Sequence, residues 1–323
     1  MTSVTSLFAT VEADLQLLTD KLKNLVGAKH PILYAAAEYL FEVSGKRVRP
    51  AIVLLVSRAT MPNQELTPRH RRLAEITEMI HTASLVHDDV VDESALRRNV
   101  PTVHSNFGNR VAVLAGDFLF AQSSWYLANL DNLEVVKLLS KVIMDMAEGE
   151  IQQSLSGFDI EISLEDYIQK SYSKTASLIA NSAKAAGVLS GVSEAMANHL
   201  YEYGRNLGLA FQVVDDVFDF TSSAETLGKP AGADMASGNL TAPVLFALEE
   251  KPYLGVLIER EFKEEGDLEE ALALVKESKG IARSQEMAKK YAAIAVQELK
   301  DLPPSEPRQA LIDLTDYVLS RLY

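Results

Sequence analysis

Two short clusters of aspartates with the same spacing are the clearest chemical signal in the sequence. Each lies inside an apolar segment and reads Asp-Asp-Val-x-Asp; their members are Asp88, Asp89 and Asp92, and Asp215, Asp216 and Asp219. Residues four positions apart share one face of a helix, so the outer aspartates of each cluster are predicted to be neighbours. Like charges at this spacing repel, and an uncompensated buried carboxylate is costly. We therefore expect a cation beside each cluster.

Three kinds of site compete as explanations of these clusters. A solvated acidic face explains one cluster easily, but it explains two copies of one spacing poorly. A calcium loop is disfavoured because the glycine and terminal glutamate of the EF-hand pattern are absent. Mg²⁺ prefers oxygen ligands and commonly binds through one or two carboxylates together with substrate phosphate oxygens. The favoured interpretation is a magnesium site for a phosphorylated substrate.

Basic residues that suit phosphate occur near both clusters. The segment from Gly45 to Pro50 carries three cations in four positions, namely Lys46, Arg47 and Arg49. Arg97 and Arg98 follow the first cluster, and Lys174 and Lys229 lie near the later helices. Arginine and lysine are the usual direct partners of phosphate. A single basic residue of this kind is more often a solvated surface charge. The occurrence of these residues together with the aspartate clusters favours a role in substrate binding.

Composition narrows the class of protein that must position these groups. The chain has 323 residues and a net charge of −14, so binding to nucleic acid or to an anionic membrane surface is disfavoured. It has no cysteine, which excludes disulfides, thiolate zinc sites and cysteine nucleophiles. No segment reaches the length of a membrane span, and the first residues lack the features of a signal peptide. The expected location is cytoplasmic.

Apolar residues recur at helical spacing through most of the chain, and no run of alternating polarity bounded by hairpin signals is evident. The expected helices cover about 4–25, 32–43, 48–60, 68–92, 110–128, 132–155, a segment opening at 163, 194–220, 240–248 and 279–300. Thr67 before Pro68 is predicted to cap one helix, and Ser163 with Asp166 is predicted to form a capping box at another. Glycines and prolines cluster between 221 and 239 and mark a break. We expect one all-α domain over 1–323, packed as a large helical bundle.

Taken together, these motifs resemble those of the trans-isoprenyl diphosphate synthases over nearly the whole chain. They follow the family's order: Gly45 to Pro50, the first Asp-Asp-x-x-Asp motif, Arg97-Arg98, Gly116-Asp117, Lys174-Thr175, Phe211-Gln212, the second aspartate motif and Gly228-Lys229. Singly they are weak signals, and jointly they are specific. The sequence as a whole is most similar to the long-chain, solanesyl-type branch of the family.

The resemblance implies an isoprenoid synthase bundle, usually a homodimer, with the two aspartate motifs facing each other across a deep cavity. It implies that Mg²⁺ is held by the first motif on one side and by the second on the other, with Asp88, Asp92 and Asp215 as metal ligands. It also assigns the substrate contacts: isopentenyl diphosphate to Lys46, Arg49, His81 and Arg98, and the allylic diphosphate to Arg97, Lys174, Thr175, Gln212 and Lys229.

Two departures from the family pattern limit this transfer. Ser44 stands where the family commonly has a glycine, which restricts the loop beside the phosphate. Asn239 stands where many relatives carry a cation. Among the histidines, His81 lies two turns before Asp88 on the same face, and a structural role competes with diphosphate contact. His87 and His104 have weaker cases, and neither is expected to bind a metal.

The implied reaction begins when the allylic carbon–oxygen bond breaks and continues as the double bond of isopentenyl diphosphate attacks the cation, with loss of a proton. The sequence identifies no base. A terpene cyclase is the runner-up from the same fold, but it has no need of an acceptor site. A non-catalytic subunit of a heteromeric synthase would not need both motifs. A metal-storage bundle is disfavoured because it would need Glu-x-x-His pairs on two helices. The assigned catalytic residues are the six aspartates of the two motifs, Lys174 and Lys229.

Product length depends on the residues one helical turn before Asp88. Ala83 and Ser84 are small there, where relatives with short products tend to carry aromatic rings, and Met79 and Ile80 in the next turn are not aromatic. Small residues that let two helices approach closely are the competing explanation. We expect an open tunnel and a product longer than about C20, with a short-chain C15 to C20 synthase as the alternative.

Overall fold

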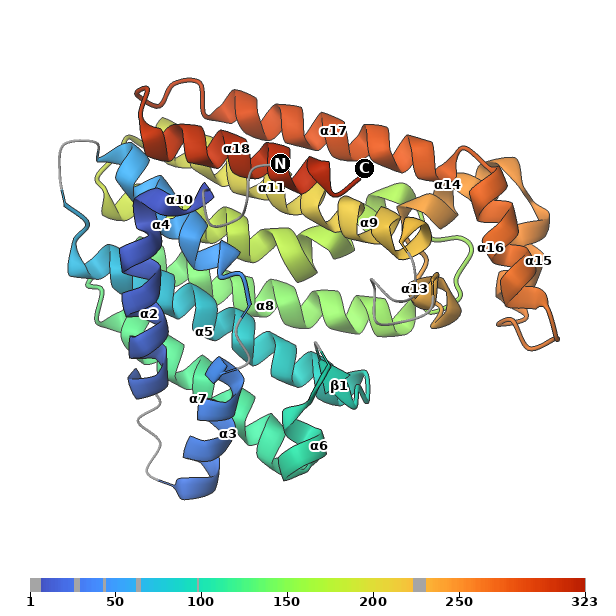
Figure 1. Cartoon of the computed structure of the whole chain (residues 1–323), viewed down its shortest axis with the longest axis horizontal. Coiled ribbons are helices and arrows are strands. Elements are labelled where there is room, and N and C mark those ends of the chain that lie inside the picture. Colours follow the sequence, from blue (N-terminus) through green and yellow to red (C-terminus); the bar gives the residue numbers. More distant parts are fainter. Residues whose placement is uncertain are drawn as a thin grey trace. The chain divides into compact units, whose positions relative to one another are not determined.

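The computed structural model describes residues 7–25, 30–42, 45–61, 65–97, 99–222 and 231–322, which form mainly helices (Figure 1). Strand pairing in these ranges is limited to an antiparallel hairpin of β1 (Leu96–Arg97) and β2 (Val100–Pro101). Over the same ranges, no helix combines the length and the apolar character that a membrane crossing requires. The prediction of an all-α fold is confirmed, whereas the cytoplasmic location stays a prediction.

Contacts along the chain define two compact units. The first comprises the described residues of 1–143, 178–201 and 299–314, and the second those of 144–177, 202–298 and 315–323. The chain passes between the units several times, so three helices contribute several residues to both: α8 (Leu133–Leu155), α11 (Glu194–Thr221) and α18 (Glu306–Ser320). A fourth, α10 (Ser177–Leu189), belongs to the first unit except for its first residue. The prediction of a single domain over 1–323 stays a prediction.

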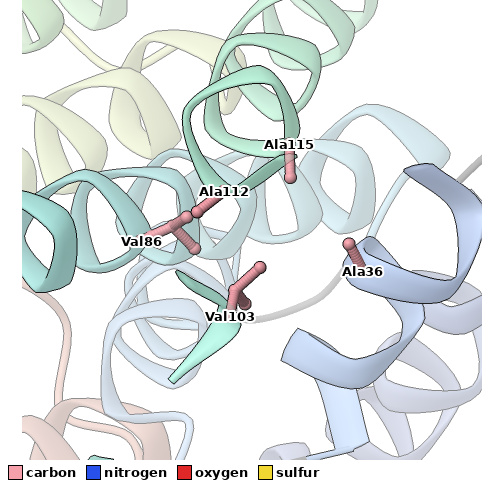
Figure 2. Packing of buried hydrophobic residues seen from close by; sticks show 5 residues of the cluster. All are labelled: Ala36, Val86, Val103, Ala112 and Ala115. Carbon is pink, nitrogen blue, oxygen red and sulfur yellow. The ribbon is translucent and has the colours of Figure 1, made fainter. Parts of the chain in front are cut away.

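The first unit is organised around the packing of α5 on α7. Its elements, besides the hairpin and the shared helices, are η1 (Ala9–Val11), α2 (Glu12–Leu25), α3 (Pro31–Glu42), α4 (Val48–Thr60), α5 (Pro68–Val91), α6 (Val103–Phe107), α7 (Asn109–Ala128) and α10 (Ser177–Leu189). Figure 2 shows Val86 of α5 directed toward Ala112 and Ala115 of α7, with Val103 of α6 beside them. These side chains are buried. Small residues on α7 therefore let the two helices approach closely.

Helix α5 begins as the sequence predicts but is capped differently. Thr67 is the residue before the helix and Pro68 opens it, yet the Thr67 side chain makes no hydrogen bond to the backbone of the first turn. Its Oγ1 instead lies 2.8 Å from Nδ1 of His70, whose ring is buried. Thr67 therefore occupies the N-cap position as predicted, but its hydroxyl pairs with a buried imidazole that needs a partner and does not cap the first turn.

The second unit consists of helices around the C-terminal half of α11. Its elements, besides the shared helices, are α9 (Leu164–Ser171), η2 (Tyr172–Ala176), α13 (Ala233–Ala236), α14 (Ala242–Glu250), α15 (Tyr253–Glu259), α16 (Asp267–Glu277) and α17 (Gly280–Glu298). The predicted capping box is confirmed: Oγ of Ser163 accepts from N of Asp166 at 3.1 Å, and the Asp166 carboxylate accepts from N of Ser163. This box fixes the start of α9.

Several helices were not expected from the sequence. These are the short α6, α13 and α15, together with α16 and α18. The segment that opens at Ser163 is also not one regular helix, since the π-helical turn η2 interrupts it between α9 and α10. π-helical turns occur often at functional sites.

Candidate functional site

The first aspartate motif lies at the C-terminal end of α5, where the helix gives way to the hairpin. The backbone N–H of Asp92 donates to the carbonyl of Asp88 and closes the last turn at 2.8 Å. The hairpin then carries Arg97 back toward the motif, as Figure 1 shows for β1 beside the end of α5. Nε of Arg97 donates to both oxygens of Asp89, at 2.8 and 3.0 Å, and Nη2 lies 2.8 Å from Oδ1. The expected cation beside this cluster is therefore Arg97.

The outer aspartates of this motif differ from the inner one in exposure. Asp89 is 5% exposed, whereas Asp88 is half-buried and Asp92 is exposed. In the part of the chain that the structure describes, no three acidic or histidine side chains form a ready metal cage. Carboxylate oxygens that supply only part of a coordination shell fit Mg²⁺, because this ion usually keeps waters and substrate phosphates as its other ligands.

The basic segment before α4 lies against the middle of α5. Nη1 of Arg49 lies 3.0 Å from Nε2 of His81, so two residues predicted to share one substrate are brought together. Arg47 has positive φ and forms an ion pair with the buried carboxylate of Glu78. Lys46 is exposed. Arg98, which is also predicted to contact isopentenyl diphosphate, lies outside the described residues, as does Ser44, which precedes the basic segment.

His87 and His104, the two histidines with weaker cases for a role in the site, have structural partners in the first unit. Nε2 of His87 lies 3.0 Å from the carbonyl of Val113. The His87 ring covers Gly116 so closely that a Cβ at that glycine would lie 2.2 Å from it. Nε2 of His104 lies 2.8 Å from the carbonyl of Ser94, just after the aspartate motif. Gly116 of the predicted motif thus provides room for a histidine ring.

The two predicted chain-length residues lie on α5, one turn before Asp88. Ala83 is fully buried, and Ser84 is half-buried with its Oγ donating to the carbonyl of His81 at 2.9 Å. Met79 and Ile80, in the next turn, are also buried. The role of these residues in product length stays a prediction.

The second aspartate motif lies near the C-terminal end of α11 and is more deeply buried. Asp216 is 2% exposed, accepts a hydrogen bond from the Tyr167 hydroxyl and accepts another from Nε2 of Gln212 at 2.9 Å. Burial raises the pKa of Asp216 to about 7; the hydrogen bonds from Tyr167 and Gln212 oppose this shift. Asp234 and Asp215 add to the rise by charge repulsion.

The outer aspartates of this motif have separate partners. Oδ1 of Asp215 lies 2.6 Å from Nη1 of Arg321, near the end of the chain. The Arg321 guanidinium also lies over the rings of Phe211 and Phe218, at 5.4 and 5.2 Å from their centroids. Asp219 is 2% exposed and accepts from the backbone N of Asp234 at 3.3 Å. The cation expected beside this cluster is thus supplied from the C-terminal segment.

Some of the residues predicted to contact the allylic diphosphate lie beside the second aspartate motif. Oγ1 of Thr175 donates to Oε1 of Gln212 at 2.7 Å, which joins the π-helical turn η2 to the motif helix. Nζ of Lys174 lies 2.9 Å from Oε2 of Glu150 and 3.3 Å from Oε1 of Gln153. The predicted Lys229 lies outside the described residues, as does Gly228.

Residue 239, a departure from the family pattern, has a basic neighbour. Lys170 is 5% exposed, and its Nζ donates to Oδ1 of Asn239 at 2.6 Å. Burial lowers the pKa of the Lys170 ammonium, and the carboxylates of Asp216 and Asp234 oppose that shift. A cation therefore lies beside residue 239, but it is the side chain of Lys170, from another part of the sequence.

Four residues of these networks were not predicted as site residues, and only Lys170 carried a usable signal. Tyr167 reads as one more apolar residue on its helix, and its buried hydroxyl becomes evident only with the fold. Lys170 precedes Lys174 by one helical turn, which is a usable signal. Arg47 was noted only as one of three neighbouring cations, and Arg321 is distant from every motif.

Comparison with known proteins identifies the family of the chain. The family model described as "Polyprenyl synthetase" matches residues 30–275. The chain is 71% identical to a "Prenyl transferase" of Synechocystis sp. over 100% of both chains, and 56% identical to "Solanesyl-diphosphate synthase 2, chloroplastic" of Oryza sativa subsp. japonica over 99% of this chain and 80% of that one.

Solved structures show the same fold. The structure of a decaprenyl diphosphate synthase from Rhodobacter capsulatus has a TM-score of 0.92 and 32% identity, and the match covers 99% of this chain and 100% of that one. A polyprenyl synthase from Caulobacter crescentus, complexed with calcium and isoprenyl diphosphate, has a TM-score of 0.90 and 34% identity over 98% of each chain. The chain belongs to the polyprenyl synthetase family.

Proposed function

We propose that this polyprenyl diphosphate synthase condenses isopentenyl diphosphate with an allylic diphosphate and releases a long-chain all-trans product. The observation that carries the proposal is the arrangement of the first motif. Arg97 holds the inner carboxylate of Asp89, while Asp88 and Asp92, one helical turn apart, are both more exposed than Asp89. Carboxylates at this spacing suit a cation that also binds phosphate, because Mg²⁺ takes one or two carboxylates together with phosphate oxygens.

Magnesium is the cofactor that this donor set favours. We assign Asp88 and Asp92 of the first motif and Asp215 of the second as its ligands, because oxygen donors of this kind prefer a small, hard cation. Bound there, Mg²⁺ supplies Lewis acidity and neutralises charge on the leaving diphosphate. The C-terminal ends of α5 and α11 carry negative partial charge, which adds to the attraction for cations at both motifs.

The chain's own residues hold the substrates and stabilise developing charge. We assign isopentenyl diphosphate to Arg49 and His81, which meet in the first unit, together with Lys46 and Arg98. Arg97, Lys174, Thr175, Gln212 and Lys229 are assigned to the allylic diphosphate. Positive groups placed where charge accumulates on the departing diphosphate lower the barrier to ionisation. No side-chain nucleophile is needed for this reaction.

The small residues Ala83 and Ser84 favour a long product, because the prenyl tail of a substrate bound near Asp88 needs a path that large side chains do not close. The names of the rice and Rhodobacter relatives, a solanesyl and a decaprenyl diphosphate synthase, also support a long product. We propose that the protein works as a homodimer, as the family resemblance implies. Light scattering of the purified protein tests that assembly directly.

The test of the function is incubation of the purified protein with labelled isopentenyl diphosphate, an allylic diphosphate primer and Mg²⁺. We expect labelled products longer than about C20, sized after phosphatase treatment, and no product when a chelator removes the metal. A purified protein that forms no product with any allylic primer would contradict the enzymatic assignment. Products that stop at C15 or C20 would contradict only the long-chain part.

A further inference from the structure

The second unit contains a buried lysine ammonium without a carboxylate partner in direct contact. Lys170 is 5% exposed, whereas lysine is almost never this buried unless it is paired. Among the residues that the structure describes, its hydrogen bond to Oδ1 of Asn239, at 2.6 Å, is the one it forms. An ammonium has three donors, so two remain for another acceptor.

The charges around Lys170 are close but do not neutralise it by contact. The carboxylates of Asp216 and Asp234 attract its ammonium, and the ammonium of Lys174 repels it. Asp216 already accepts hydrogen bonds from Tyr167 and Gln212. Burial of an ion is costly, and apolar residues of similar volume often replace a buried charge without loss of stability. Packing alone therefore gives no reason for a lysine at this position.

The position of Lys170 is well defined. It lies three residues after Tyr167 on α9, so both side chains extend from one face of a short helix that the Ser163 capping box fixes at its start. Asn239 is also fixed, because its backbone N donates to the carbonyl of Asp234 at 2.9 Å. One face of α9 thus presents a hydroxyl to the second aspartate motif and an ammonium beside it.

We propose that Lys170 is a further diphosphate-binding residue of the second aspartate motif and that Asn239 holds its ammonium in place. The inference rests on the proposed function. The two remaining donors of the ammonium bind phosphate oxygens of the substrate diphosphate. An amide suits position 239 because it orients the ammonium without neutralising it. A second cation at that distance would repel Lys170.

Binding of inorganic diphosphate in the presence of Mg²⁺, measured by calorimetry on the whole protein, tests this proposal. Lys170→Met removes the charge at similar length, and Asn239→Asp leaves the ammonium in place but neutralises it with a direct ion pair. We expect both variants to bind diphosphate about 10- to 100-fold more weakly, the range for loss of a charge-assisted hydrogen bond. A merely structural role would leave the Asn239→Asp affinity unchanged.

Lys184 provides a matched control, because its Nζ donates to Oδ1 of Asn198 at 2.7 Å on the surface of the first unit. Lys184→Met should bind diphosphate as the wild type does. Thermal unfolding of each variant separates binding from folding, and Asn239→Asp keeps the test decisive if Lys170→Met does not fold. Wild-type binding that both variants retain within about twofold would overturn this inference alone. Absence of Mg²⁺-dependent diphosphate binding in the wild type would overturn the proposed function and the inference together.

Discussion

The two aspartate motifs have one spacing but are stabilised in different ways. In the first, the inner Asp89 accepts from the guanidinium of Arg97, a charged partner that is itself partly exposed. In the second, the inner Asp216 accepts from the neutral side chains of Tyr167 and Gln212 and is 2% exposed. The same short pattern therefore supports an ion pair to a partly exposed arginine in one unit and hydrogen bonds from neutral side chains in the other.

The segments that supply the partners of each motif explain the difference. Both motifs lie near the C-terminal end of a long helix, where the helix dipole disfavours carboxylates and favours cations. After α5 the hairpin returns within a few residues and supplies Arg97. For Asp215 the basic partner, Arg321, comes from near the end of the chain. Motif spacing fixes which carboxylates share a helix face, but the surrounding segments fix their charge state and partners.

Removal of one outer aspartate from each motif tests whether both serve the same reaction and should have the largest effect. We expect Asp88→Ala and Asp215→Ala each to reduce turnover by about 10³-fold, because each loses part of the charge stabilisation that a bound metal supplies. Steady-state assays with saturating Mg²⁺ and circular dichroism would measure this. Asp301→Ala, at an exposed turn, is the control for loss of a negative charge. Turnover near the wild-type value in either variant would contradict a mechanism that needs both motifs.

Product length offers a second contrast, because the residue four positions before the first aspartate is Ser84 in one motif and Phe211 in the other. Ser84→Phe makes the first motif resemble the second at this position. If the prenyl tail passes this face of α5, the ring should close its path and shift products to about C15 or C20 without abolishing condensation. Chromatography of the labelled products would show the shift. Ser84→Ala is the control and should leave product length unchanged, whereas a long product from Ser84→Phe would place the tunnel elsewhere.

The basic residues of the two units should divide the substrates between them. Arg49→Ala, in the first unit, should raise the KM for isopentenyl diphosphate, and Lys174→Ala, in the second, should raise the KM for the allylic diphosphate. Loss of one charge-assisted contact corresponds to about 10- to 100-fold in each case. Initial rates measured with each substrate varied in turn separate the two effects. The reverse pattern would show that the substrates are assigned to the wrong cations, although the residues would still bind phosphate.

Much of this fold and part of the site follow from the sequence. Helical periodicity and the Ser163 capping box predicted the long helices, and like-charge repulsion predicted a cation beside each cluster. The meeting of Arg49 with His81 also agrees with the residues grouped by the family resemblance. These features depend on local spacing or on motifs, which a sequence displays directly.

The parts that the sequence did not predict depend on contacts between distant segments. Nothing near Asp215 indicates Arg321, which lies more than a hundred positions later. The hydroxyl of Tyr167 acquires its role only because burial forces it to find the acceptor Asp216. Thr67 is the N-cap residue as predicted, but its hydroxyl does not bond to the first turn for a similar reason, since the buried His70 competes for it. Long-range partners of this kind are settled by packing and not by local pattern.

The pH dependence of the free energy of unfolding should distinguish the buried Asp216 of the second motif from the ion-paired Asp89 of the first. Because burial raises the pKa of Asp216 to about 7, the folded protein holds a proton on this group that the unfolded chain releases above its ordinary pKa of 3.8. This contribution is fully present below the unfolded pKa and is lost as the pH rises toward 7, at no more than about 1.4 kcal/mol per pH unit.

The Asp216→Asn variant lacks this titration, so its stability should fall less over the same pH window. Urea unfolding at several pH values with a metal chelator present measures the difference, because the other titrating groups cancel between the two proteins. Equal pH dependence in wild type and variant would show that Asp216 titrates as it does in the unfolded chain.

The smallest effects should come from loss of the partner of each inner aspartate. Tyr167→Phe removes a hydrogen bond from the buried Asp216 and should cost about 1–3 kcal/mol of unfolding free energy. Arg97→Ala takes the guanidinium away from the buried Asp89 carboxylate and should also cost about 1–3 kcal/mol. Added salt screens the second interaction but not the first, so the Arg97→Ala cost should shrink between low and high salt while the Tyr167→Phe cost stays constant. Urea unfolding of both variants at two salt concentrations measures these changes. An Arg97→Ala cost that exceeds the Tyr167→Phe cost at high salt would show that the first motif, and not the second, is the more tightly buried of the two.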